Sequence, residues 1–191
     1  MPNTTTNNAS YISTGKPNVT GAVYMAPTTA TAPTGVSSTL SSDFKALGYV
    51  SDEGMAWSNS VDSENIKAWG GDTVYTVQEG TEDTVKLSFL EALNVDVMKL
   101  YYGDDAVSGS LAAGITISAS GADLGNHIFV IDTVLADGRA KRCVIPNGRV
   151  TEREDLEYVD NDVLKYGVTI TCIPDSNGKT HYEYIAATPT P

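Results

Sequence analysis

The chain has 191 residues, and its 24 acidic against 12 basic side chains give a formal net charge of −12. This balance argues against wrapping nucleic acid or lying on an anionic membrane, because both need clustered Lys and Arg, while a surface past which DNA slides remains compatible with it. The apolar runs are far shorter than the roughly 20 residues of a membrane-spanning helix, so no membrane partner is expected.

The N-terminal segment has an unusual composition. Its first acidic residue is Asp43, and Asn, Thr, Ser, Ala, Pro and Gly dominate what precedes it. Residues 1–20 lack the apolar core of a secretory signal, so none is expected. A stretch this poor in apolar residues cannot bury enough surface to order itself, so residues 1–18 are predicted to form a flexible arm.

One apolar island interrupts this segment at residues 19–25. Its alternation predicts a strand with Val23 and Met25 on one face and Tyr24 on the other. Residues 27–42 then lack periodicity, and a loop of that length is typically functional or flexible. We predict that this loop grips a neighbouring molecule.

From Phe44 onward, β-branched and aromatic runs alternate with turn residues, which predicts antiparallel hairpins. Asp137-Gly138 and Asn177-Gly178 supply the positive φ that tight turns need, and the polar stretch 79–83 separates the first pair of runs. The expected strand pairs are 73–77 with 84–89, 127–135 with 139–145, and 167–173 with 180–185.

A single helix is predicted over residues 95–102. Asn94 is a suitable N-cap, and Gly103 can end the helix in the left-handed conformation. Two turns would be marginal alone, so the helix must pack on a sheet. The expected fold is α+β and mainly antiparallel β: a sandwich- or barrel-like domain over residues 19–185 with one short flanking helix, followed by a disordered tail at 186–191.

The sequence contains no recognisable catalytic or metal-binding motif. His127 and His181 are the only histidines, and a lone histidine in a strand is more often structural than catalytic. Cys143 and Cys172 are interpreted as small buried apolar residues, and a bridge between them would require their strands to pair. The stretch 175–178 resembles half a calcium loop, but a hairpin turn explains it more simply. No enzyme activity, cofactor or metal is therefore expected.

Two charged clusters follow one another in the second half of the chain. They are solvated surfaces on one interpretation and complementary contacts between neighbouring copies on the other. The candidate contact residues are Arg139, Lys141, Arg142 and Arg149, then Glu152, Glu154, Asp155 and Glu157.

Over residues 16–102 the sequence closely resembles the major tail, or tail-tube, proteins of long-tailed (siphovirus-type) bacteriophages. The order and spacing of several stretches together carry the resemblance, rather than any one motif. These stretches are KPNVTGAVY at 16–24, DFKALGYVSDEG at 43–54, ENIKAWGGD at 64–72 and LEALNVDVMK at 90–99.

The resemblance implies a structural virion protein of the phage tail, assembled in the host cytoplasm. In this family hexameric rings stack into a tube, inner strands join into a continuous barrel, and DNA and the tape-measure protein pass through the lumen. Tail terminator and initiator proteins would be further partners. Acids lining the lumen would repel the phosphate backbone, and Glu79, Glu82 and Asp83 are candidates, although an outer turn fits them equally well.

The alternative is a secreted or surface β-sandwich that binds or adheres to a partner. Trp57, Trp69 and ten tyrosines could provide a stacking platform for such a function.

Overall fold

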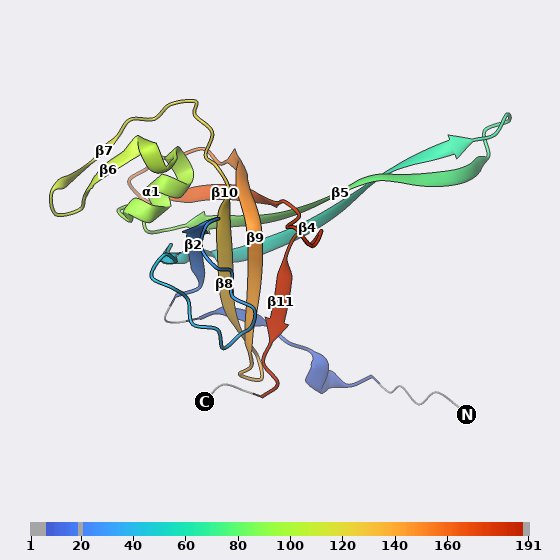
Figure 1. Cartoon of the computed structure of the whole chain (residues 1–191), viewed down its shortest axis with the longest axis horizontal. Helices are drawn as coiled ribbons and strands as arrows, with labels where there is room; N and C mark the ends of the chain where they lie inside the picture. Colours follow the sequence, from blue (N-terminus) through green and yellow to red (C-terminus); the bar gives the residue numbers. More distant parts are fainter. Residues whose placement is uncertain (1–6, 19–20, 189–191) are drawn as a thin grey trace.

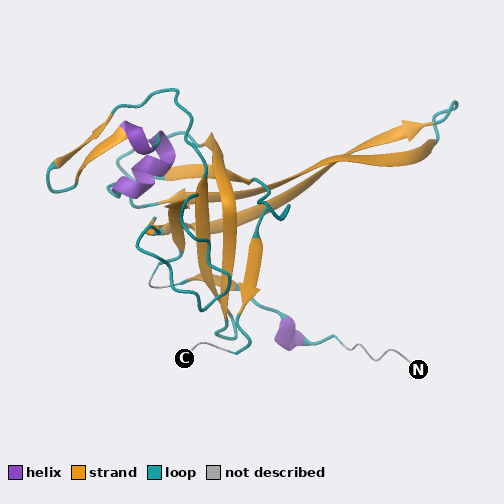
Figure 2. Ribbon diagram, in the orientation of Figure 1, coloured by secondary structure: helices purple, strands orange, loops and turns teal. Residues whose placement is uncertain are grey.

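The computed structural model describes residues 7–18 and 21–188, and its element order is that of a mainly antiparallel β protein (Figures 1 and 2). The 3₁₀ turns are η1 (Ala9–Tyr11) and η2 (Asp104–Ala106), and the α-helix is α1 (Val95–Tyr102). The strands are β1 (Gly15–Pro17), β2 (Val23–Pro27), β3 (Lys45–Ala46), β4 (Val50–Lys67), β5 (Thr73–Phe89), β6 (Val107–Ser110), β7 (Gly114–Ile117), β8 (His127–Leu135), β9 (Ala140–Arg153), β10 (Tyr166–Cys172) and β11 (Tyr182–Ile185).

Strands β6 and β7 pair only with each other in a small separate sheet, and the other strands form two layers that share β9. The order along the main sheet is β3-β2-β8-β9-β10-β5-β4, with β1 paired to β8 and β11 to β9. Strands β2, β8 and β9 run roughly across β4, β5 and β10 in Figure 1. We call β1, β2, β3, β8, β11 and residues 140–145 of β9 layer one, and β4, β5, β10 and residues 148–153 of β9 layer two.

Strand β9 leaves layer one and enters layer two at Gly148. An added Cβ there would lie 2.7 Å from the Phe129 ring and 3.0 Å from Ile170, so only glycine allows this close approach. The register of β8 on β9 also shifts at this point, between the pairs His127–Gly148 and Phe129–Ile145. A bulge of this kind bends a strand and lets one strand serve two sheets.

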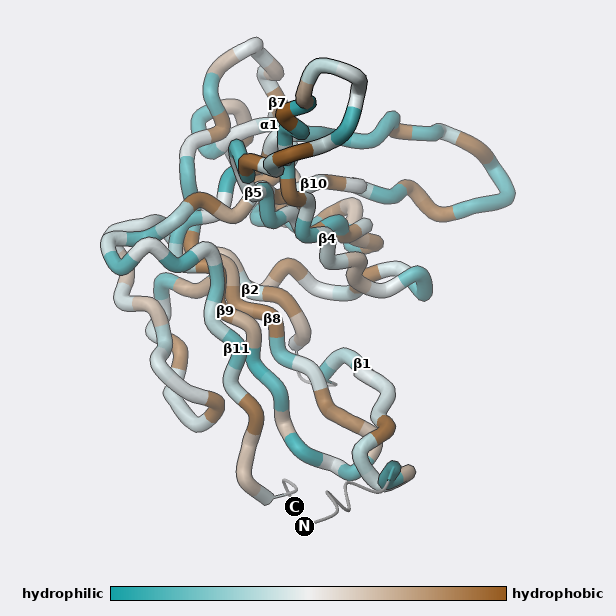
Figure 3. The backbone as a smooth tube through the Cα atoms, turned by 90° about the vertical axis from the view of Figure 1, so that its right-hand side faces the viewer, coloured by the Kyte–Doolittle hydropathy of each residue, from teal (hydrophilic) through white to brown (hydrophobic). Residues whose placement is uncertain are grey.

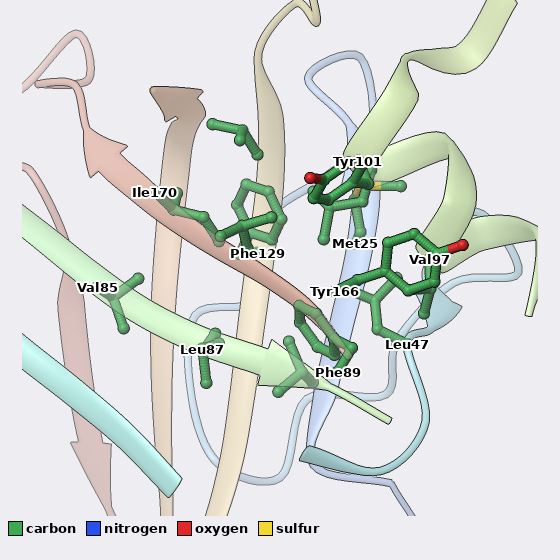
Figure 4. Packing of buried hydrophobic residues seen from close by; sticks show 14 of the residues in the cluster. Met25, Leu47, Val85, Leu87, Phe89, Val97, Tyr101, Phe129, Tyr166 and Ile170 are labelled. Atoms are coloured by element: carbon green, nitrogen blue, oxygen red, sulfur yellow. The ribbon is translucent and has the colours of Figure 1, made fainter. Parts of the chain in front are cut away.

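The main core lies between the layers and under α1 (Figure 4). Phe89 and Phe129 are fully buried in it, with Val85, Val168 and Ile170 beside them. In Figure 3 the apolar stretches concentrate along β2, β8 and β9. The expected α+β, sandwich-like fold is confirmed, and the sheet is not closed within the chain.

A second, smaller cluster lies on the other face of layer one, where Ile128, Val130 and Val144 are buried. The loop 28–44 covers it with Ala30, Ala32, Leu40 and Phe44. The loop predicted to grip a neighbour therefore also contributes to the core of its own chain.

The predicted helix is confirmed with its bounds. Asn94 is its N-cap and accepts a hydrogen bond from the backbone N–H of Asp96 at 3.0 Å. Gly103 ends the helix with φ 104° and ψ 150°. The prediction of a left-handed helical conformation at Gly103 is therefore wrong, although its φ is positive. Val97 and Leu100 are buried against the sheet, as the short length requires.

The hairpin of β8 and β9 is confirmed, and Gly138 has φ 84° in its turn. The predicted strand at 19–25 is found as β2, with Val23 and Met25 facing the main core and Tyr24 facing the second cluster. Residues 19–20 of that prediction lie outside the described part of the chain.

The predicted hairpin of 73–77 with 84–89 is wrong. Both runs belong to one continuous strand, β5, and Gly80 between them has no positive φ. Its partner is β4, which was not predicted, and the turn lies at 68–72, where Gly70 and Gly71 have φ 115° and 99°. The polar residues at 79–83 indicated a turn, but 79–82 are polar because the strand is solvent-exposed there, and Asp83 is a buried polar residue.

The predicted pairing of 167–173 with 180–185 is also wrong. The turn exists, with the N–H of Gly178 donating to the carbonyl of Asp175 at 2.9 Å, but the strands beside it separate. Strand β10 pairs with residues 148–153 of β9, and β11 pairs with residues 141–144. Because β9 bends, its C-terminal half pairs with β10 and its N-terminal half pairs with β11.

Segments at the chain ends are partly ordered. Within the predicted arm, β1 pairs with residues 133–135 of β8, and residues 1–6 lie outside the described chain. In the predicted tail, Ala186 donates to the carbonyl of Ala140 at 2.9 Å, and residues 189–191 are not described. Across residues 7–18 and 21–188, no helix combines the length and apolarity that crossing a membrane requires.

Both cysteines are free and buried, as expected. Burial raises the pKa of each thiol to about 12, with Glu183 adding to the effect at Cys143 and Asp83 at Cys172. Since the thiolate is the reactive form, we expect a thiol reagent such as Ellman's to label the native protein at least ~100-fold more slowly than the urea-unfolded chain. Equal rates would show that the buried strands open readily.

Candidate functional site

The face of layer two that points away from the core is polar. Its side chains alternate with core residues such as Val85, Leu87 and Ile170, so they project to the opposite side. We call this surface the polar face: Ser58, Ser60, Asp62 and Glu64 of β4, Glu82, Thr84, Lys86 and Ser88 of β5, Thr169 and Thr171 of β10, and Arg149, Thr151, Glu152 and Glu154 at the end of β9.

Hydrogen bonds and one ion pair fix the middle of the polar face. Lys86 Nζ lies 2.6 Å from Glu154 Oε1, and the Thr151 and Thr171 hydroxyls are 2.8 Å apart. The hydrogen bond between Lys86 and Glu154 raises the pKa of Lys86 and lowers that of Glu154, so both side chains remain charged at neutral pH. Carboxylates outnumber cations on this face, so its charge is negative.

Layer two ends in two unpaired edges. Among the described strands, β4 pairs only with β5, which leaves its outer edge free along its length. The pairing of β9 with β8 stops at Gly148, so residues 149–153 have β10 on one side alone. Unpaired backbone N–H and C=O groups of this kind are templates for a further strand.

The outer part of the β4–β5 hairpin leaves the body as a two-stranded ribbon (Figure 1). We call residues 58–82 the ribbon; all of them are exposed, and none contributes to either core cluster. Trp69 at its turn is fully exposed. An isolated two-stranded hairpin is at best marginally stable in water, so a ribbon of this length calls for a partner.

The register divides the ribbon into two different faces. The face that continues the polar face carries Asp62 and Glu64 and then, near the turn, the apolar side chains Ile66, Tyr75 and Val77. The other face is uncharged until Lys67, and on it Thr76 donates to Asn65 Oδ1 at 2.7 Å. The residues of β4 on these two faces were not predicted to lie in a strand, whereas Tyr75, Thr76 and Val77 belong to the predicted strand at 73–77.

The three candidate lumen acids are placed differently. Glu82 lies on the polar face opposite Ser60, and Glu79 is the unpaired residue where the ribbon register shifts. Asp83 does not fit an exposed lumen acid, because it projects to the core side and is 7% exposed. Strand alternation turns its side chain away from that of Glu82.

The four bases of the predicted contact cluster each have a carboxylate partner in their own chain. Arg139 lies 2.8 Å from Asp137, Lys141 2.9 Å from Glu183, and Arg149 2.6 Å from Asp123. Arg142 is buried and pairs with Asp132. Arg139, Lys141 and Arg149 thus form ion pairs at the surface of one subunit and Arg142 forms a buried pair, and a role of these bases in contacts between copies stays a prediction.

The acidic half of that cluster is more open. Glu154 is bound to Lys86, whereas Glu152, Asp155 and Glu157 are exposed and have no ion pair among the described residues. These three acids remain available for contacts between copies.

The two histidines lie apart. His127 Nε2 is 3.4 Å from Asp104, and His181 Nδ1 is 3.3 Å from Asp83. The residues that the structure describes contain no group of three or more His, Cys, Asp or Glu side chains arranged to hold a metal ion.

A protein-family model described as phage tail tube protein matches residues 4–191, nearly the whole chain. No curated protein matches the sequence. The family match supports a tail protein and gives no support to the alternative of a secreted binding module. The chain therefore belongs to the phage tail tube proteins, a family of structural components of the virion tail.

Proposed function

We propose that copies of this chain join edge to edge through β4 of one copy and residues 149–153 of β9 in the next. The two unpaired edges of layer two carry this proposal. By family resemblance the copies form hexameric rings that stack into the tail tube, after assembly in the host cytoplasm. The tape-measure protein and the tail terminator and initiator are the further partners expected on the same ground.

The strand order supports closure into one continuous sheet. Layer two runs β9-β10-β5-β4, and every neighbouring pair is antiparallel. Strand β4 therefore runs opposite to β9, so copies related by rotation about a ring axis would continue the antiparallel pattern across each junction. Closure would also remove the edges that make the free subunit prone to unspecific pairing.

The polar face is the proposed wall of the lumen. Where β10 accompanies β5, the opposite face of layer two is buried in the core, so a sheet closed through these edges would present the polar face to a channel. Glu82, Asp62, Glu64 and Glu152 would add negative charge to that wall. Duplex DNA carries about one charge per 1.7 Å, so a wall of this kind repels it and lets it pass without binding.

Cysteine cross-linking tests the proposed junction. Barrel closure staggers the strands, so Thr151→Cys is combined in turn with Ser58→Cys, Ser60→Cys and Asp62→Cys along β4. At least one pair is expected to give a ladder of covalent multimers on mild oxidation of assembled protein. The native cysteines are buried and do not interfere.

A matched control uses the same face but a central strand. Thr84→Cys with Thr151→Cys places one thiol on β5, which pairs with both β4 and β10 in its own chain. This pair should give no ladder. If hollow tubes are visible by negative-stain microscopy and no β4 position cross-links to Thr151→Cys, the proposed junction is wrong.

A further inference from the structure

The ribbon leaves the body at a defined residue. Strand β10 accompanies β5 from Phe89 to Asp83, where Cys172 is its last partner. Beyond this point β5 has only β4 beside it, and both strands are exposed. Whatever holds Asp83 therefore sets the direction in which the ribbon starts.

The Asp83 carboxylate is buried at this exit and accepts hydrogen bonds from two elements. Asn59, its cross-strand neighbour on β4, donates through Nδ2 to Oδ1. Thr180, from the segment before β11, donates through its hydroxyl to Oδ2. His181 Nδ1 lies 3.3 Å from the same oxygen.

An aromatic contact also joins the segment 180–181 to strand β4. The His181 ring lies against Trp57 of β4, with the ring centroids 4.4 Å apart and the planes inclined at 55°. Trp57 is cross-strand to Val85 and packs on the main core. The segment 180–181 thus contacts both strands of the hairpin at its root, and Tyr182 follows directly as the first residue of β11.

We infer that Asp83, with Asn59, Thr180, His181 and Trp57, forms a brace that fixes the angle at which the ribbon leaves the body. The ribbon is joined to the body at one end only, so a small rotation at the root displaces the turn at 68–72 far more. The brace matters for assembly only if the ribbon contacts neighbouring copies, and in that respect the inference rests on the proposed function.

The electrostatics of the site agree with a permanently charged anchor. Burial alone would raise the pKa of Asp83, but hydrogen bonds from Asn59 and Thr180 and the nearby His181 outweigh it, so its pKa lies below the usual value. Hydrogen bonds to an ionised group are stronger than neutral ones, which suits a contact that must resist bending.

The test measures ribbon direction in the unassembled chain. Spin labels at Glu79→Cys on the ribbon and Lys99→Cys on α1 report the distance distribution between ribbon and body by pulsed electron resonance. Asp83→Ala is expected to broaden this distribution about twofold, because the ribbon root then loses the contacts of the carboxylate with Asn59, Thr180 and His181. Thr180→Val combined with His181→Gln keeps Asp83 and should broaden it as well, even if Asp83→Ala folds poorly.

Glu82→Gln is the matched control, because it changes the neighbouring carboxylate on the opposite face and should leave the distribution unchanged. An unchanged distribution in both brace variants would overturn the inference, whatever happens to assembly. A broadened distribution with normal tubes would support the brace and contradict a role of the ribbon in the tube. Failure of the brace and failure of the proposed function are therefore distinguishable.

Discussion

Replacing residues 60–82 with a two-residue Asn-Gly turn is expected to abolish tube formation while leaving a folded monomer. The new turn joins Asn59 and Asp83, which face each other directly in β4 and β5, and Asn-Gly suits such a two-residue hairpin. None of the removed residues belongs to a core cluster, so the free energy of unfolding should change by no more than about 0.5 kcal/mol. Urea unfolding measures stability, and electron microscopy with light scattering measures assembly.

A finer variant separates the two faces of the ribbon. Ile66→Ser, Tyr75→Ser and Val77→Ser together remove the apolar side chains near the turn but keep the ribbon. The matched control, Thr73→Ser with Gln78→Ser, alters the opposite face. If the apolar side chains are the contact, the triple variant fails to assemble and the control assembles. Normal tubes from the truncated chain would show that the ribbon is dispensable and that the unpaired edges suffice.

The elements that the sequence predicted correctly have a buried face or a specific cap. The helix at 95–102 was marked by Asn94 and by apolar residues at helical spacing, and β8 by its apolar run and Asp137-Gly138. In each case a local signal and a packing requirement pointed the same way.

Within the ribbon, the predicted strand at 73–77 is found in β5, whereas the rest of the ribbon was not predicted as strand, for the opposite reason. Both faces of the ribbon are exposed, so residues 58–67 and 78–82 show no alternation of apolar and polar residues, and alternation is the main signal of a strand. If the ribbon contacts another copy of the chain, as proposed, its apolar side chains are buried only in the assembly and are exposed in the monomer. The same exposure explains why residues 79–82 are polar and resemble a turn.

The brace could not be predicted from local sequence either. It brings Asn59, Asp83 and Thr180 together from distant parts of the chain, and their contact depends on the bend of β9 that sends β10 and β11 to different halves of one strand. Arg142 also donates hydrogen bonds to the carbonyls of Gly35 and Ser38 in loop 28–44, and local sequence could not predict these because they depend on how the loop crosses layer one.

Arg142→Ala is expected to destabilise the monomer by about 3–5 kcal/mol, the usual cost of removing one partner from a buried ion pair. The Arg142 guanidinium binds Asp132 through two hydrogen bonds, of 2.7 and 2.8 Å. Its remaining nitrogen donates to the loop carbonyls of Gly35 and Ser38 at 3.2 and 2.6 Å. The substitution leaves the Asp132 carboxylate uncompensated and frees the loop that covers the second cluster. Urea unfolding of the unassembled chain measures the change.

Two matched variants sharpen this prediction. Arg139→Ala removes a solvated pair with Asp137 and should cost no more than about 1 kcal/mol. The double variant Asp132→Ala/Arg142→Ala should be less destabilised than Arg142→Ala alone, because no unpaired charge remains. If Arg142 instead bonded a neighbouring copy, its removal would weaken tubes and leave monomer unfolding unchanged. That result would restore Arg142 to the contacts between copies and would make loop 28–44 an arm for a neighbour rather than a cover for its own chain.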